Sequence, residues 1–103
     1  MASAREIVEE QRAQESLDAW CKQDSRVADV WLGFTWRLAR DPLVIDCQGE
    51  PHAVEIPHSE PPTFLAKTTP IVVGDPVITA LYQFDAEQII VLDISVRKAK
   101  IIP

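Results

Sequence analysis

The sequence is poor in the residues that build metal centres, redox sites and tight turns, with two cysteines and three glycines among 103 residues. Cys21 and Cys47 are too few for a metal knuckle and too far apart for a CxxC redox pair, so we expect reduced thiols that act as small buried hydrophobes. No apolar run approaches the roughly 20 residues of a membrane span, and the opening MASAREIVEE lacks the apolar region of a signal peptide. The sequence therefore predicts a cytoplasmic protein without a membrane segment.

Basic residues are also scarce. Ten Lys and Arg stand against sixteen Asp and Glu, and the net charge of -6 is the wrong sign for a protein whose whole surface follows a phosphate backbone. No Gly-rich phosphate loop is present, so we expect no nucleotide and no other small-molecule cofactor. His52 and His58 lie near Glu50, Glu55 and Glu60, but no feature of the sequence fixes a ligand geometry there, and we expect no metal site.

The chain does have an ordinary globular content of apolar residues, 47%, in a length that suits one domain covering residues 1–103. Seven of its eight prolines lie between Pro42 and Pro76, and the first 41 residues contain none. Because proline breaks helices, helices are allowed early in the chain and excluded from its middle.

Two amphipathic helices are predicted in the proline-free part. The first covers Gln11–Lys22, with Ala13, Leu17, Trp20 and Cys21 on one face. Asp24 or Ser25 caps the second, which runs to Arg40 and is stopped by the Asp41-Pro42 dipeptide. Its apolar stripe consists of Val27, Val30, Trp31, Phe34 and Leu38. A connection of two or three residues makes the pair an antiparallel hairpin.

Two regions leave alternatives open. Leu32 and Trp36 lie off the main stripe of the second helix, so this helix is either covered on two sides or shows an apolar patch to a partner. Arg5 to Val8 is either a brief opening strand or the frayed start of the first helix.

Later segments carry apolar runs and turns typical of strands. We expect strands at Leu43–Ile45, at Ala53–Ile56, at the sheet edge in Phe64–Thr68, and in two long runs, Val77–Phe84 and Gln88–Val96. Asp85, Ala86 and Glu87 have the length of a hairpin loop between the two long runs. The predicted fold is α+β: a short N-terminal strand and an antiparallel helical hairpin packed on a small antiparallel β-sheet.

Short phrases of mostly apolar residues follow one another in order along the chain. Ala13 and Leu17 form an A-x-x-x-L phrase, and the second helix ends in LARDP at Leu38–Pro42. Ile78–Asp85 contains a strand core with a tyrosine and an acidic turn, and Val91–Ile94 reads V-L-x-I before the basic pair Arg97 and Lys98. In this order and spacing the phrases resemble the RelE/ParE superfamily of bacterial toxins from type II toxin-antitoxin systems.

The resemblance implies that a cognate antitoxin protein binds and neutralises the chain. It also implies one of two activities: metal-independent cleavage of mRNA in the ribosome, or binding of a protein target such as DNA gyrase. The chain departs from the nuclease pattern. Thr79 stands where nuclease members usually carry an arginine, Val96 occupies the histidine position before Arg97, and the tyrosine near the end is replaced by Ile101 or Ile102.

The charge distribution favours the protein-binding activity. Between Asp41 and Val96 the chain has nine acidic residues and one basic residue, Lys67. This leaves few cations to hold RNA phosphates. We therefore predict a toxin-like protein that binds a protein target or is a degenerate member, with a ribosome-dependent mRNA endoribonuclease as the alternative. Candidate phosphate-holding catalytic residues are Arg97, Arg40 and Lys67; candidate target-binding residues are Arg97, Lys98, Lys100 and Arg37; the candidate partner interface is Leu32 and Trp36.

Overall fold

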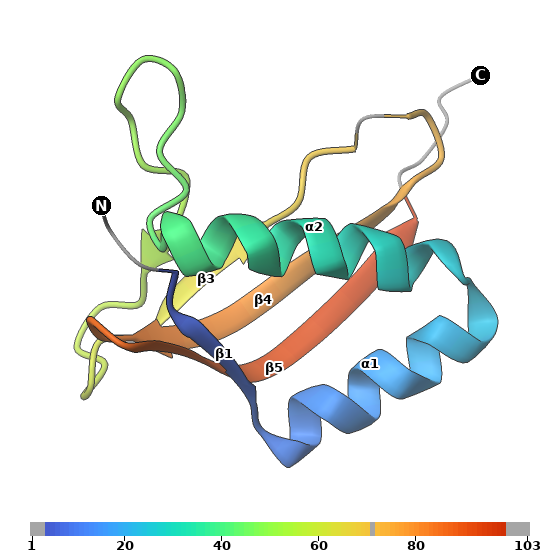
Figure 1. Cartoon of the computed structure of the whole chain (residues 1–103), viewed down its shortest axis with the longest axis horizontal. Coiled ribbons are helices and arrows are strands. Elements are labelled where there is room, and N and C mark those ends of the chain that lie inside the picture. The colour runs from blue at the N-terminus through green and yellow to red at the C-terminus, as the bar shows by residue number, and fades with distance from the viewer. Residues whose placement is uncertain (1–3, 71, 99–103) are drawn as a thin grey trace.

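A five-stranded sheet with two helices against one face makes up the described part of the computed structural model, residues 4–70 and 72–98 (Figure 1). The elements in chain order are β1 (Glu6–Glu9), α1 (Gln11–Gln23), α2 (Arg26–Arg40), β2 (Val54–Glu55), β3 (Phe64–Lys67), β4 (Pro76–Phe84) and β5 (Gln88–Lys98). The α+β class and the two helices are confirmed. Of the two alternatives for Arg5 to Val8, the strand is the one the structure adopts.

The sheet is mixed, so the predicted all-antiparallel sheet is wrong. The strand order is β1-β5-β4-β3-β2. β2, β3, β4 and β5 pair antiparallel, whereas β1 lies parallel to β5, with Ile7 opposite Ile89. The first strand pairs with the last because the helices carry the chain away from β1 and the meander brings β5 back beside it. Sequence periodicity shows which residues form a strand but not which strand it pairs with.

Two further strand predictions need correction. Leu43–Ile45 forms no strand, because the segment is taken up by the turn that ends α2, and it contributes one isolated bridge between Ile45 and Pro51. Phe64–Thr68 was expected at the sheet edge, but β3 lies between β4 and the two-residue β2. The segment between α2 and β2 projects from the rest of the molecule as a loop (Figure 1).

The helix boundaries have local causes. The carboxylate of Asp24 accepts a hydrogen bond from the backbone N–H of Arg26, 3.0 Å away, at the start of α2. Of the two predicted caps, Asp24 therefore supplies this acceptor, and Ser25 makes no side-chain cap bond. At the other end the backbone N–H of Asp41 bonds to the carbonyl of Arg37, and Pro42 prevents a further turn.

The core lies between the helices and one face of the sheet. Alternate residues of β4, namely Ile78, Ala80 and Tyr82, point to this face and are fully buried. The helices and β5 complete the same cluster with Ala13, Val27, Trp31, Phe34, Leu38, Ile89, Val91 and Ile94. The cysteines contribute less than expected: Cys21 is half-buried against this cluster, and Cys47 is exposed in the projecting loop. The expectation that both are buried is therefore wrong for Cys47.

Candidate functional site

The outward side of α2 carries two large apolar side chains that the core leaves uncovered. Leu32 is 72% exposed and Trp36 is 62% exposed. They lie one helical turn apart, so they form a single patch on the helix surface. The side chains that face the sheet, such as Trp31 and Leu38, belong to the buried stripe. Of the two alternatives for Leu32 and Trp36, the structure therefore adopts the exposed patch.

This patch borders a groove between α2 and β1. The groove has a volume of about 590 Å³ and is lined by Ala4, Arg5, Ile7, Asp29, Leu32, Gly33, Thr35, Trp36, Ala39 and Arg40. Gly33 has open space where a Cβ would stand, so the helix surface beside Leu32 is shallow. The groove is therefore an apolar trough with a strand on one side and the exposed patch on the other.

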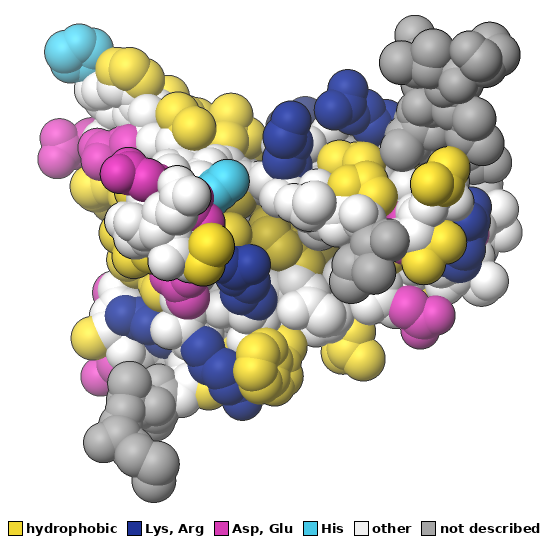
Figure 2. All heavy atoms as spheres, turned by 90° about the horizontal axis from the view of Figure 1, so that it is seen from above, with side chains coloured by type: hydrophobic (Ala, Val, Ile, Leu, Met, Phe, Trp, Pro, Cys, Tyr) yellow, Lys and Arg dark blue, Asp and Glu magenta, His cyan; other side chains and the backbone are white. Residues whose placement is uncertain are grey.

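Two arginines lie at the end of this groove where β1 begins. The Arg40 guanidinium lies 4.0 Å from the centre of the Trp36 ring and donates to the carbonyl of Trp36. This cation–π contact holds the indole against the helix surface. Arg5 donates from Nε to the carbonyl of Asp85 at 2.6 Å. Both guanidinium groups thus have partners within the chain. On the face drawn in Figure 2, Lys and Arg side chains lie beside exposed hydrophobic ones.

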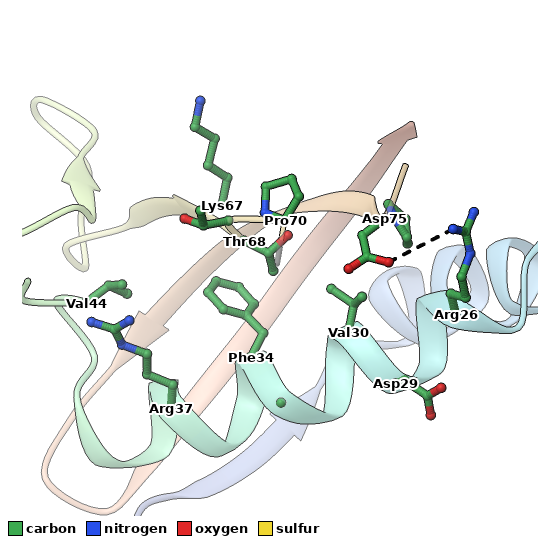
Figure 3. Close-up of a pocket in the computed structure, with 13 residues that line it drawn as sticks. Arg26, Asp29, Val30, Phe34, Arg37, Val44, Lys67, Thr68, Pro70 and Asp75 are labelled. Carbon is green, nitrogen blue, oxygen red and sulfur yellow. Dashed lines mark ion pairs between the residues drawn. The ribbon is translucent and has the colours of Figure 1, made fainter. Parts of the chain in front are cut away.

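A second cavity, of about 570 Å³, lies on the other side of α2, where the segment between β3 and β4 passes over it (Figure 3). Val30, Phe34 and Val44 form its apolar part. Of its charged groups, Arg26 pairs with Asp24 at 3.0 Å and with Asp75 at 4.0 Å. The hydrogen bond and the charge of Asp24 raise the pKa of Arg26.

The turn after α2 shapes this second cavity. Val44 has a φ of 51°, a left-handed conformation that a β-branched residue seldom adopts. The carboxylate of Asp41 accepts from the N–H of Ile45 at 2.7 Å, and Arg37 donates to the carbonyl of Ile45 at 2.8 Å. These bonds on either side of Ile45 hold Val44 in its strained conformation, with its side chain buried.

The candidate catalytic cations do not meet. Arg40 ends α2 beside the start of β1, while Arg97 lies near the end of β5 opposite Val77 on β4. Lys67 lines the second cavity, and Figure 3 shows its side chain extending away from α2. A cleavage site needs cations and a general base around one phosphate. Lys67 and Arg97 lie on the two strands that flank β4, opposite Thr79 and Val77, whereas Arg40 lies apart from them at the end of α2, near the start of β1.

The candidate target-binding residues are also separated. Arg97 is exposed on β5, and the backbone of Lys98 ends that strand opposite Pro76. Arg37 is on α2 and is bound to the carbonyl of Ile45. Lys100 lies outside the described residues. The described part of the chain therefore does not bring Arg37 into one patch with Arg97.

Tyr82, the only tyrosine of the sequence, has a structural role. It is fully buried and its hydroxyl donates a hydrogen bond to the carbonyl of Pro42. Burial, with a smaller contribution from the charge of Asp41, raises the pKa of Tyr82 far above its ordinary value. The phenol therefore remains protonated at neutral pH and holds the turn after α2 against the sheet.

The histidines form no metal centre in the described part of the chain. His52 Nε2 lies 2.9 Å from the carboxylate of Asp46. The same carboxylate accepts backbone hydrogen bonds from Gln48 and Glu50, and these contacts lower the pKa of Asp46. Within residues 4–70 and 72–98, no three His, Cys, Asp or Glu side chains are placed to hold a metal ion.

Sequence reasoning missed several contributors to these surfaces. Arg5 and Ile7 line the groove because β1 pairs with β5, which the sequence did not indicate. Arg26, Asp75 and Val44 line the same second cavity, although up to 49 positions separate them along the chain. No spacing motif could have linked them, since the contacts depend on how the segment between β3 and β4 folds over α2.

No family model, curated protein or solved structure matches the chain. The described residues contain no helix of the length and apolar character needed to cross a bilayer.

Proposed function

We propose that the chain is a toxin-like component of a type II toxin-antitoxin system, similar to the RelE/ParE superfamily, and that a small antitoxin binds and neutralises it in the cytoplasm. The order of strand, two helices and further strands supports this proposal, together with the sequence phrases that suggested it. One observation carries it: the exposed pair Leu32 and Trp36 borders an apolar groove. Large exposed apolar side chains around a groove are typical of a protein interface.

The downstream activity we propose is binding of a protein target, such as DNA gyrase, or none in a degenerate member. Cleavage of mRNA is the alternative. The separation of Arg40 from Arg97 and Lys67 favours protein binding, because phosphate-holding cations must surround one site. The burial of Tyr82 favours it as well, because a phenol held by Pro42 is not free to act as a general acid.

Co-purification tests the proposal at the patch. We expect the tagged chain to retain the product of the neighbouring reading frame. Leu32→Asp and Trp36→Asp should each weaken that complex by tenfold or more, since each places a charge in an apolar contact (about 1.4 kcal/mol per tenfold). Val73→Asp is the matched control, because Val73 is also an exposed apolar residue but does not line the groove. Equal losses for all three variants, or no complex with the unaltered chain, would contradict the proposal.

Two assays separate the downstream activities. Inhibition of DNA supercoiling by purified gyrase would support protein-target binding, and unchanged supercoiling would remove that target. Primer extension on cellular mRNA after induction reports cleavage. New 5′ ends that depend on the chain would overturn our preference for protein binding over the nuclease.

A further inference from the structure

β1 has an outer edge with unpaired backbone groups. The N–H groups of Glu6 and Glu10 bond to the carbonyls of Glu87 and Val91 on the β5 side. Because backbone groups alternate in direction along a strand, those of Ile7 and Glu9 point to the opposite side. No strand of the described chain pairs there, since β1 ends the strand order. Two residues therefore present an open hydrogen-bonding edge.

The open edge lies next to the groove on α2. The N–H of Arg5, which points to the same side as the N–H of Ile7, bonds to the carbonyl of Ala39 near the end of α2. Further along, the indole N–H of Trp31 donates to the carboxylate of Glu9 at 2.6 Å. These two contacts hold α2 along β1, and Ile7 between them lines the groove. A strand added to β1 would therefore direct alternate side chains toward Leu32 and Trp36.

The charged residues in and beside β1 indicate which charges an added strand should carry. Glu6 and Glu10 are exposed and form no ion pair within the described chain, whereas Arg5 and Arg40 already have partners. A second copy of this chain is disfavoured, because two copies of residues 5–10 would each bring three glutamates, at positions 6, 9 and 10, with only Arg5 to offset them. The uncompensated carboxylates instead favour a basic segment of another protein.

We propose that an extended, basic segment of the partner protein pairs with the outer edge of β1 as an additional strand and places an apolar side chain in the groove beside Leu32 and Trp36. The inference rests on the proposed function only in taking that partner to be the antitoxin. Backbone hydrogen bonds to Ile7 and Glu9 would supply affinity, and the groove and Glu6 would select the side chains.

The edge can be tested without knowing the partner. The probe is a synthetic seven-residue peptide of alternating valine and lysine, and its control replaces each lysine by aspartate. We expect the lysine peptide at millimolar concentration to shift the amide NMR signals of Ile7 and Glu9 and to slow their hydrogen exchange, and the aspartate peptide to do neither. Binding of both peptides alike, shifts confined to other residues, or no binding would overturn the edge-pairing proposal.

A backbone substitution gives a sharper test. Ligation at Cys21 allows residues 1–20 to be made synthetically with an N-methyl group on Ile7, which removes an outward N–H and leaves the bonds to β5 in place. Binding of the lysine peptide should fall by tenfold or more relative to the unmodified ligated chain, with unchanged thermal stability. N-methylation of Val8, whose N–H points toward β5, should lower the stability instead.

The product of the neighbouring reading frame then separates the two proposals. If it binds and the N-methyl group on Ile7 weakens the complex by tenfold or more, edge pairing is supported. If it binds with unchanged affinity while Trp36→Asp abolishes binding, the edge proposal fails and the proposed function stands. If it does not bind but the lysine peptide does, the edge proposal stands and the toxin-antitoxin assignment fails.

Discussion

Trp31 and Trp36 lie five residues apart on one helix and have opposite environments. Trp31 is 6% exposed, packs beside Phe34 and donates its indole N–H to Glu9. Trp36 is 62% exposed and is covered on one side by the Arg40 guanidinium. Five residues turn an α-helix by about 140°, so one indole faces the sheet and the other faces away from it. The two sides of α2 therefore differ: one packs into the core and stabilises the fold, and the other is exposed, where we propose that a partner binds.

We expect the largest difference in the free energy of unfolding between substitutions of two leucines of this helix. Leu38→Ala should lower the free energy of unfolding by about 3 kcal/mol, because Leu38 is fully buried and its removal leaves a cavity. Leu32→Ala should change it by less than about 0.5 kcal/mol, because Leu32 is exposed. Urea denaturation of both variants measures the difference. Comparable losses would contradict the separation of the two sides.

The tryptophans provide the next comparison. Trp31→Phe removes the hydrogen bond to Glu9 and part of the core volume, so we expect a loss of about 2 kcal/mol. Trp36→Phe should cost less than about 1 kcal/mol, since it weakens one exposed cation–π contact with Arg40. Thermal unfolding followed by circular dichroism tests both. A larger loss for Trp36→Phe would mean that the outer patch contributes to folding.

The stability of the chain at alkaline pH tests the buried core, because Tyr82 lies in it and can lose its proton. The folded chain raises the pKa of this phenol above that of the unfolded chain, so its contribution is fully present below about pH 10 and is lost as pH rises. We expect the free energy of unfolding to fall by up to about 1.4 kcal/mol per pH unit above that point. Because the chain has one tyrosine, tyrosinate absorbance follows it alone.

Tyr82→Phe is the control for the alkaline measurement. This variant should lose stability at neutral pH, because the carbonyl of Pro42 loses its donor, and should lack the extra alkaline decline seen with Tyr82. The same alkaline decline in both proteins would assign it to other groups.

The smallest effect concerns exposed carboxylates at the turns. Backbone N–H groups of Glu87 and Gln88 donate to Asp85 and lower the pKa of its carboxyl. A lowered pKa contributes stability that is present above the ordinary value near 3.8 and is lost as pH falls through the folded value. Asp85→Asn should therefore slightly flatten the decline in stability between about pH 5 and about pH 2, measured by urea denaturation. An unchanged decline would show that this turn contributes nothing.

Much of the local structure was predictable from the residues. The absence of proline before Pro42, the apolar stripe from Val27 to Leu38 and the Asp41-Pro42 stop predicted α2 almost residue by residue. The long runs of β4 and β5 and the turn at Asp85 were equally clear. These features depend on neighbouring residues, whose spacing the sequence displays directly.

The partners of these elements were not predictable in the same way. Leu43–Ile45 has the composition of a strand, but the bonds from Asp41 and Arg37 to Ile45 use its backbone groups in a turn. From the sequence, Lys67 and Arg40 are assigned to one phosphate-binding site, because the sequence shows which residues are basic but not where they lie in space. Their positions on β3 and at the end of α2 separate them.

The sequence alone determined two amphipathic helices, a meander of strands and the position of Leu32 and Trp36 off the main apolar stripe of α2, because periodicity and proline act over a few residues. The tertiary structure decided that β1 pairs with β5, that Leu32 and Trp36 border a groove, and that Ile7 and Glu9 leave an open edge. These features arise where segments distant along the chain meet. Their contacts depend on burial and hydrogen bonding of the whole fold, which local spacing does not contain.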